Sequence, residues 1–176
     1  MLPVDRRVTY AADMGAGAEL QWVHVHAPDA AIREPGADGL ELHVRATTVP
    51  GPTPGNFAVA DVTTIAHGVE KQHENVLISG DDPGDLARLL DAALKTPVGD
   101  RTASLFDDGM TFRIEGDGHG RWSVECRPVN APSPDDSSDT FPTFSFELGT
   151  AAMQQAIAEL EAVSAALTNV RANPPH

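Results

Sequence analysis

The stretch Leu40-Glu41-Leu42-His43-Val44-Arg45-Ala46 decides the fold class, because apolar and polar residues alternate along it. This period of two is typical of a half-buried strand with one face on a core. A second strand is predicted at residues 20–26, and the turn dipeptides Pro35-Gly36 and Asp38-Gly39 stand between the two segments. We therefore expect residues 20–26 and 40–46 to pair as a hairpin with a long connecting loop.

Six further strands and two helices are predicted in the rest of the chain. The strand patterns lie at residues 57–65, 74–78, 104–106, 110–114, 122–127 and 144–148. Acidic residues and Pro83 precede a short amphipathic pattern that ends near Lys95 and is typical of a helix. After Thr150, an apolar stripe from Met153 to Val170 predicts a long C-terminal helix.

The order of these elements places the chain in the α+β class, because runs of strands are followed by single helices. We expect a mainly antiparallel sheet of about eight strands, with a short middle helix and a long C-terminal helix packed on it. The 176 residues fit a single domain over residues 1–170. Residues 128–142 contain four prolines with serine and aspartate, and they are predicted to form a mobile insertion. Residues 171–176 are predicted to be a frayed tail.

The charge of the chain narrows the classes of partner. The chain contains 12 lysine and arginine residues and 26 aspartate and glutamate residues, so its formal net charge is −14. A nucleic-acid binder needs clustered cations for phosphate contacts, and an anionic membrane repels such a chain. A strongly negative surface instead attracts a basic protein partner. No apolar run of 18 residues predicts a membrane span, so a cytoplasmic location is expected, whereas the oligomeric state stays open.

Two acidic clusters are predicted to contact this basic partner. They comprise Asp81, Asp82 and Asp85 before the short helix, and Asp135, Asp136 and Asp139 in the Pro-rich segment. Helix capping is an alternative role for the first cluster, and solubility of a mobile loop is an alternative for the second. Neither cluster has the spacing of a twelve-residue calcium loop.

Histidines indicate an alternative function, a metal site. His24 and His26 are two residues apart on one predicted strand, so their imidazoles point to the same face, and His43 lies on the expected hairpin partner. Three neutral imidazoles can bind zinc and leave one coordination position for a water that attacks a substrate. The alternation around His43 also fits a plain solvent-facing residue, so both interpretations stay open. His67 and His73 are interpreted as polar residues that flank a turn between strands.

Catalytic and cofactor-binding residues are not predicted elsewhere. Cys126, the single cysteine, shares a strand face with Trp122 and Val124, which predicts a buried and unreactive thiol. The glycine-rich segment at residues 116–120 leads into a strand rather than a helix, so it is predicted to be a turn and not a phosphate-binding loop. No Gly-x-Ser-x-Gly elbow occurs in the chain. The sequence therefore favours a protein without enzymatic activity.

A leucine-rich helix and the strands after it follow one another in a defined order over residues 76–170. The helix has the sequence Asp85-Leu86-Ala87-Arg88-Leu89-Leu90-Asp91-Ala92-Ala93-Leu94, and strands around residues 112–114, 122–126 and 144–148 lead to a closing helix. This order resembles the WapI family of immunity proteins. The resemblance implies neutralisation of a co-encoded toxin by direct binding, without catalysis, and it carries over no functional residue.

Three functions follow from these patterns as hypotheses. The leading one is a non-enzymatic acidic module that binds a basic protein, in the manner of an immunity or inhibitor protein. The second is a metal-dependent hydrolase or metal-binding domain built on the His-x-His strand. The third is a structural subunit of a larger assembly, in which a sheet edge or the C-terminal helix packs on neighbours.

Overall fold

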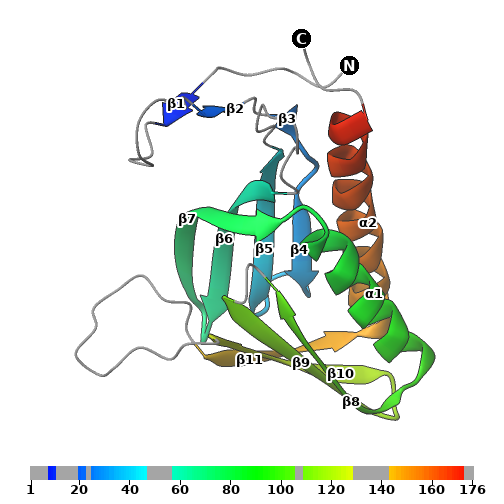
Figure 1. The fold of residues 1–176 in the computed structure, drawn as a ribbon. Coiled ribbons are helices and arrows are strands. Elements are labelled where there is room, and N and C mark those ends of the chain that lie inside the picture. Colours follow the sequence, from blue (N-terminus) through cyan, green and yellow to red (C-terminus); the bar gives the residue numbers. More distant parts are fainter. Residues whose placement is uncertain are drawn as a thin grey trace.

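Two four-stranded meanders, each followed by a helix, make up most of the computed structural model (Figure 1). The first comprises β4 (Ala30–Arg33), β5 (Gly39–Ala46), β6 (Phe57–Ala66) and β7 (Val69–Ser79), and α1 (Asp82–Lys95) follows it. The second comprises β8 (Val98–Leu105), β9 (Met110–Asp117), β10 (Arg121–Pro128) and β11 (Phe144–Gly149), and α2 (Thr150–Ala172) follows it. The structure describes residues 8–10, 20–22, 25–46, 57–105, 109–128 and 143–172.

Three short strands complete the described part of the chain. β3 (Val25–His26) pairs with the end of β5 and makes the first sheet five-stranded. β1 (Val8–Tyr10) and β2 (Leu20–Trp22) pair with each other. Every strand pair is antiparallel, so the predicted α+β class and both predicted helices are confirmed. Together with β3, the strands of the two meanders form one sheet of five and one of four strands, where a sheet of about eight strands was expected.

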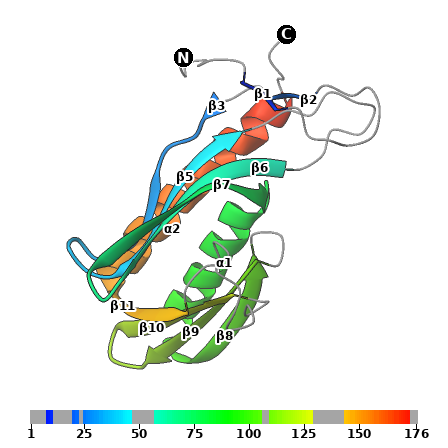
Figure 2. The same cartoon turned by 90° about the vertical axis from the view of Figure 1, so that its left-hand side faces the viewer.

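A single core joins the two sheets and the two helices. Buried side chains of β5, such as Leu42, belong to the same cluster as Phe112 of β9, Leu90 of α1 and Leu160 of α2. Each helix packs against the sheet of the other meander. The helix after the first meander, α1, packs against β8 and β9, whereas the helix after the second, α2, packs against β4 and β5 (Figure 2). Because each meander supplies the helix that covers part of the other sheet, the two halves are expected to unfold together.

One strand was not predicted from the sequence, and another begins earlier than predicted. The expected long loop before β5 contains β4, where Ala30 and Ile32 are buried and pair with β5. Four residues are too short a run for a clear alternation, which explains why β4 was missed. β8 begins at Val98 rather than at residue 104, and its first three residues are exposed on both faces. A strand of this kind has no apolar face and therefore no hydrophobic period.

A β-bulge explains the third difference, in β7. This strand begins at Val69 instead of residue 74, and its register with β6 shifts between His73 and Val76. The extra residue reverses which alternate positions face the core, so His73 and Val76 both lie on the inner face. The interpretation of His73 as a polar residue beside a turn was wrong. Its side chain is 6% exposed and lies 3.5 Å from the Thr64 hydroxyl.

His67 and Gly68 form the two-residue turn between β6 and β7. Both have positive φ angles, 52° and 73°, which is the turn geometry that matches the twist of paired strands. The Asp38 carboxylate, from the turn between β4 and β5, accepts hydrogen bonds from the backbone N–H of Gly68 at 2.9 Å and of His67 at 2.8 Å. These bonds lower the pKa of Asp38, so its carboxylate stays charged and ties the two hairpin turns together.

The predicted insertion and tail fall largely outside the described residues. β10 ends at Pro128 and description resumes at Thr143, so the expected mobile segment is not placed. α2 includes Arg171 and Ala172, which had been predicted as the start of the tail. No helix among the described residues is long and apolar enough to cross a membrane.

Candidate functional site

The first sheet has one buried and one half-exposed face. Leu40, Leu42 and Val44 of β5 are fully or almost fully buried, so the alternate residues Glu41 and His43 point away from the core. The antiparallel register places Glu41 opposite Thr63 and His43 opposite Asp61 on β6. We call the face that carries Glu41, His43, Asp61 and Thr63 the outer face.

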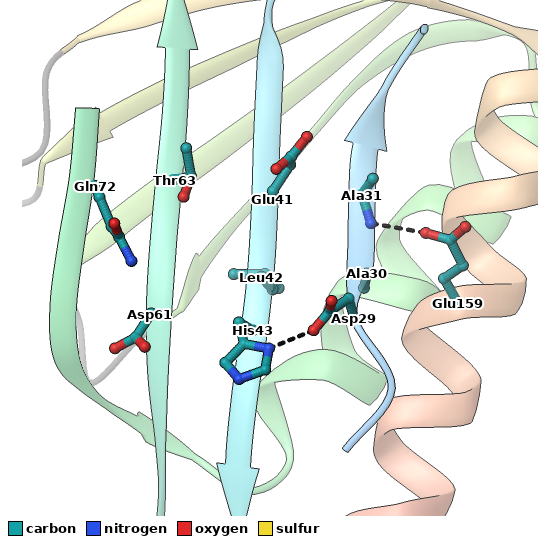
Figure 3. Close-up of a pocket in the computed structure, with 10 residues that line it drawn as sticks. All are labelled: Asp29, Ala30, Ala31, Glu41, Leu42, His43, Asp61, Thr63, Gln72 and Glu159. Carbon is teal, nitrogen blue, oxygen red and sulfur yellow. Dashed lines mark hydrogen bonds and ion pairs between the residues drawn. The ribbon is translucent and has the colours of Figure 1, made fainter. Parts of the chain in front are cut away.

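A hollow of about 380 Å³ lies on the outer face, beside β4 (Figure 3). Asp29, Glu41, Asp61 and Glu159 contribute four carboxylates to its lining, together with the imidazole of His43. Ala31 leaves the space open, because its small side chain stands where neighbouring strands carry longer ones. The lining includes neither lysine nor arginine among the described residues.

Two side-chain contacts connect the elements that line this hollow. His43 Nδ1 meets Asp29 Oδ1, and both side chains are open to solvent, at 43% and 76% exposure. On the other side, Glu159 reaches from α2 and accepts the backbone N–H of Ala31 at 2.7 Å (Figure 3). Residues from three separate parts of the chain therefore converge on one small area, and the local charge there is dominated by carboxylates.

Most of the described cations neutralise carboxylates outside the hollow. In the second sheet, Arg121 pairs with Glu147 at 3.0 Å and Arg127 pairs with Glu125 at 2.6 Å. On α1, Lys95 pairs with Asp91 at 2.6 Å. At the border of the outer face, Arg33 lies 3.2 Å from Glu41. The cations of these other pairs therefore compensate carboxylates of the second sheet and of α1, and Arg33 compensates one carboxylate of the hollow.

The predicted metal site is assembled only in part by the described residues. The backbone of His26, in β3, pairs with that of Arg45, two residues along β5 from His43. His24, the third predicted ligand, lies outside the described residues. Within the described ranges, no group of three histidine, cysteine, aspartate or glutamate side chains is arranged to hold a metal ion.

The acidic cluster before α1 has a structural role in part. Asp82 was expected on the surface, and this was wrong: it is 5% exposed, and its carboxylate accepts the backbone N–H of Ser79 at 2.8 Å. Asp85 pairs with Arg88 one helical turn later, and Asp81 is exposed. Asp82 is the first residue of α1, and its carboxylate binds the last residue of β7, so it fixes the strand–helix junction rather than capping the helix. The second predicted cluster, Asp135, Asp136 and Asp139, lies outside the described residues.

Sequence reasoning did not bring Asp29, Asp61 and Glu159 together. The alternation around β5 placed Glu41 and His43 on one face, and a correct register with β6 would have added Asp61. Glu159 is 118 residues away from Glu41 in the chain, and no local pattern marks its contact with β4.

Cys126 lies in the core and is not part of a reactive site. It is 0% exposed and pairs across the second sheet with Phe112 on one side and Phe144 on the other. Burial raises the pKa of its thiol, so the nucleophilic thiolate is scarce at neutral pH. The predicted burial of this side chain is confirmed.

A thiol reagent is expected to test this burial. In the native protein, Cys126 should react with dithiobis(nitrobenzoate) at least about 100-fold more slowly than in denaturant, since modification requires local opening. Absorbance of the released thiolate measures both rates. Comparable rates in the two conditions would show that the thiol is accessible in the folded state.

Comparisons with protein-family models, with curated proteins and with solved structures gave no match to this chain.

Proposed function

We propose that this protein is a non-enzymatic binding module whose outer face docks on a basic protein. The observation that supports the proposal is the hollow, where four carboxylates and one imidazole surround about 380 Å³ on a half-exposed sheet face. Lysine or arginine side chains of a partner are the groups that such a lining complements. An immunity or inhibitor role requires nothing beyond this contact, because covering the basic surface of a toxin suffices to block it.

Electrostatics also determine how such a complex should form. A net charge of −14 attracts a basic protein at long range and raises the association rate. The individual contacts are solvent-exposed, so each contributes little and several must act together. We therefore expect an association rate that falls steeply with ionic strength, as screening shortens the range of attraction.

Charge reversal in the hollow tests this function. Wild-type protein, the variant Asp61→Lys and the matched control Glu115→Lys are each used to capture proteins from native lysate at low salt. Glu115 is an exposed carboxylate on β9, in the other sheet, so its reversal changes net charge equally without touching the hollow. We expect one basic protein to bind wild type and control, and to bind Asp61→Lys at least about tenfold more weakly.

The captured protein is then purified and its association rate is measured between low and high salt. Unchanged melting temperatures of the two variants establish that the fold is intact. Equal affinity of the partner for Asp61→Lys and Glu115→Lys, or a rate that does not respond to salt, would contradict docking on the outer face.

A further inference from the structure

The two edges of the first sheet differ in how they end. At one edge, Glu159 of α2 accepts the backbone N–H of Ala31 and so closes β4. The other edge is β7, which runs for 11 residues from Val69 to Ser79. In the described part of the chain, β6 is the strand neighbour of β7, and the sheet order ends there. An edge strand of this length exposes a row of backbone donors and acceptors.

Hydrogen-bond alternation identifies the direction of the backbone groups across the sheet. Ala31 donates its N–H away from β5, so the backbone groups of its neighbours Ala30 and Ile32 point toward β5. The backbone groups of their partners on β5, Leu42 and Leu40, point toward β4. The bond from the N–H of Ala27 to the carbonyl of Val44, at 3.0 Å, fits the same alternation on β5.

The same alternation continues to β7. The backbone N–H and C=O groups of Glu41 point toward β6 and pair with those of Thr63. The backbone groups of the next residue, Thr64, therefore point toward β7. Thr64 pairs with Lys71, whose backbone therefore faces β6. The N–H and C=O groups of Gln72, the next residue, consequently point outward, away from the sheet.

The charged side chains of β7 determine which kind of strand can pair with this edge. Glu70 and Glu74 are exposed on β7, on either side of Gln72. Lys71 is the exposed cation between them, so two carboxylates and one ammonium group line this edge. A second copy would bring another pair of glutamates, on another chain of net charge −14, to this edge, and like charges across paired strands are destabilising. An extended segment that carries lysine or arginine is complementary instead. Gln72 also lines the hollow, so the edge and the outer face form one continuous surface.

We propose that the basic partner contributes an extended segment that pairs with β7 and adds a strand to the first sheet. This inference rests on the proposed function and names the part of the partner that docks. The added strand bonds the outward backbone groups of Glu70 and Gln72, while its cationic side chains lie beside Glu70 and Glu74. Backbone pairing holds the segment, and the carboxylates select for positive charge.

Two synthetic peptides separate strand addition from simple charge attraction. The first has eight residues of alternating lysine and valine. The second has the same side chains, but all its backbone nitrogens are methylated, so that it keeps the charge and loses the N–H donors of a strand. We expect the methylated peptide to bind the full-length protein at least about tenfold more weakly at low salt. Calorimetry measures both affinities.

Hydrogen exchange and one variant locate the contact. In the complex with the unmethylated peptide, the amides of Glu70 and Gln72 should gain protection. The variant Gln72→Pro removes an N–H that the β6–β7 ladder does not use, and it should weaken this peptide while leaving the methylated one unaffected. The melting temperature checks that the variant folds, and the exchange measurement on wild type stands without it.

Each outcome has a defined meaning. Equal binding of both peptides overturns strand addition but leaves acidic docking intact. Binding of neither peptide overturns both proposals. A dimer of the protein alone, seen by light scattering and accompanied by protection of Glu70 and Gln72, would make the occupant a second copy and overturn the assignment to a basic partner.

Discussion

Replacement of Trp122 by alanine is expected to lower the free energy of unfolding by about 4 kcal/mol. The indole is 3% exposed and lies on the inner face of β10. Its Nε1 donates to the backbone carbonyl of Ala93, in the last turn of α1, at 3.1 Å. That carbonyl cannot accept the usual helical bond from four residues later, because residue 97 is proline. Trp122→Ala therefore creates a cavity and also leaves this acceptor without its donor.

The variant Trp122→Phe separates these two effects. It removes the N–H donor but keeps most of the apolar volume, so the cavity is much smaller and we expect a loss of about 1 to 2 kcal/mol. Urea titration followed by circular dichroism measures both free energies. A loss below about 1 kcal/mol for Trp122→Ala would contradict the role of this side chain in joining α1 to the second sheet.

Replacement of Gly116 by alanine is expected to lower the free energy of unfolding by about 3 kcal/mol. Gly116 lies opposite Trp122, where β9 pairs with β10. A Cβ atom at this position would stand 2.1 Å from the carbonyl oxygen of Pro97 and 3.0 Å from Trp122 Nε1. The Pro97 carbonyl cannot retreat easily, since it accepts the backbone N–H of Gly118 at 3.1 Å. The added methyl group must therefore displace the backbone or the indole.

The adjacent variant Glu115→Ala provides the control for Gly116. Glu115 is exposed on the same strand, and its removal should change the free energy of unfolding by no more than about 0.5 kcal/mol. Equilibrium unfolding of the two variants under identical conditions makes the comparison. If Gly116→Ala proved as stable as Glu115→Ala, the close contact between β9 and Pro97, in the connection after α1, would not constrain the fold.

The prediction of elements succeeded for the longer strands and helices that have one apolar face, whereas β4, which has a buried face but only four residues, was missed. β5, β9, β10 and β11 each alternate buried and exposed residues, and α2 carries a stripe that includes Met153 and Leu160. Elements without such a face were missed or shortened. β8 is exposed at its start, and the first half of β7 is polar up to the bulge. Local periodicity carries no information where burial does not alternate.

The candidate site was less accessible to sequence reasoning than the fold. Glu41 and His43 could be placed on one face, but the partner contacts were predicted at two acidic clusters, and Asp82 of the first cluster binds the backbone N–H of Ser79 instead. A carboxylate near a helix start has the same sequence signature whether it binds a partner or a backbone N–H. Burial distinguishes the two roles, and burial depends on the neighbouring elements.

Composition and short-range periodicity sufficed to predict the class of fold, the two helices, the buried thiol and the excess of acidic residues. Three features became visible only in the folded chain. Each helix packs on the sheet of the other meander, and Asp29, Asp61 and Glu159 line one hollow. The backbone N–H and C=O groups of Gln72 point away from the sheet. The physical reason is register. Strand pairing and helix docking bring together residues that are far apart in the chain, and a shift of one residue would move each of them to the opposite face.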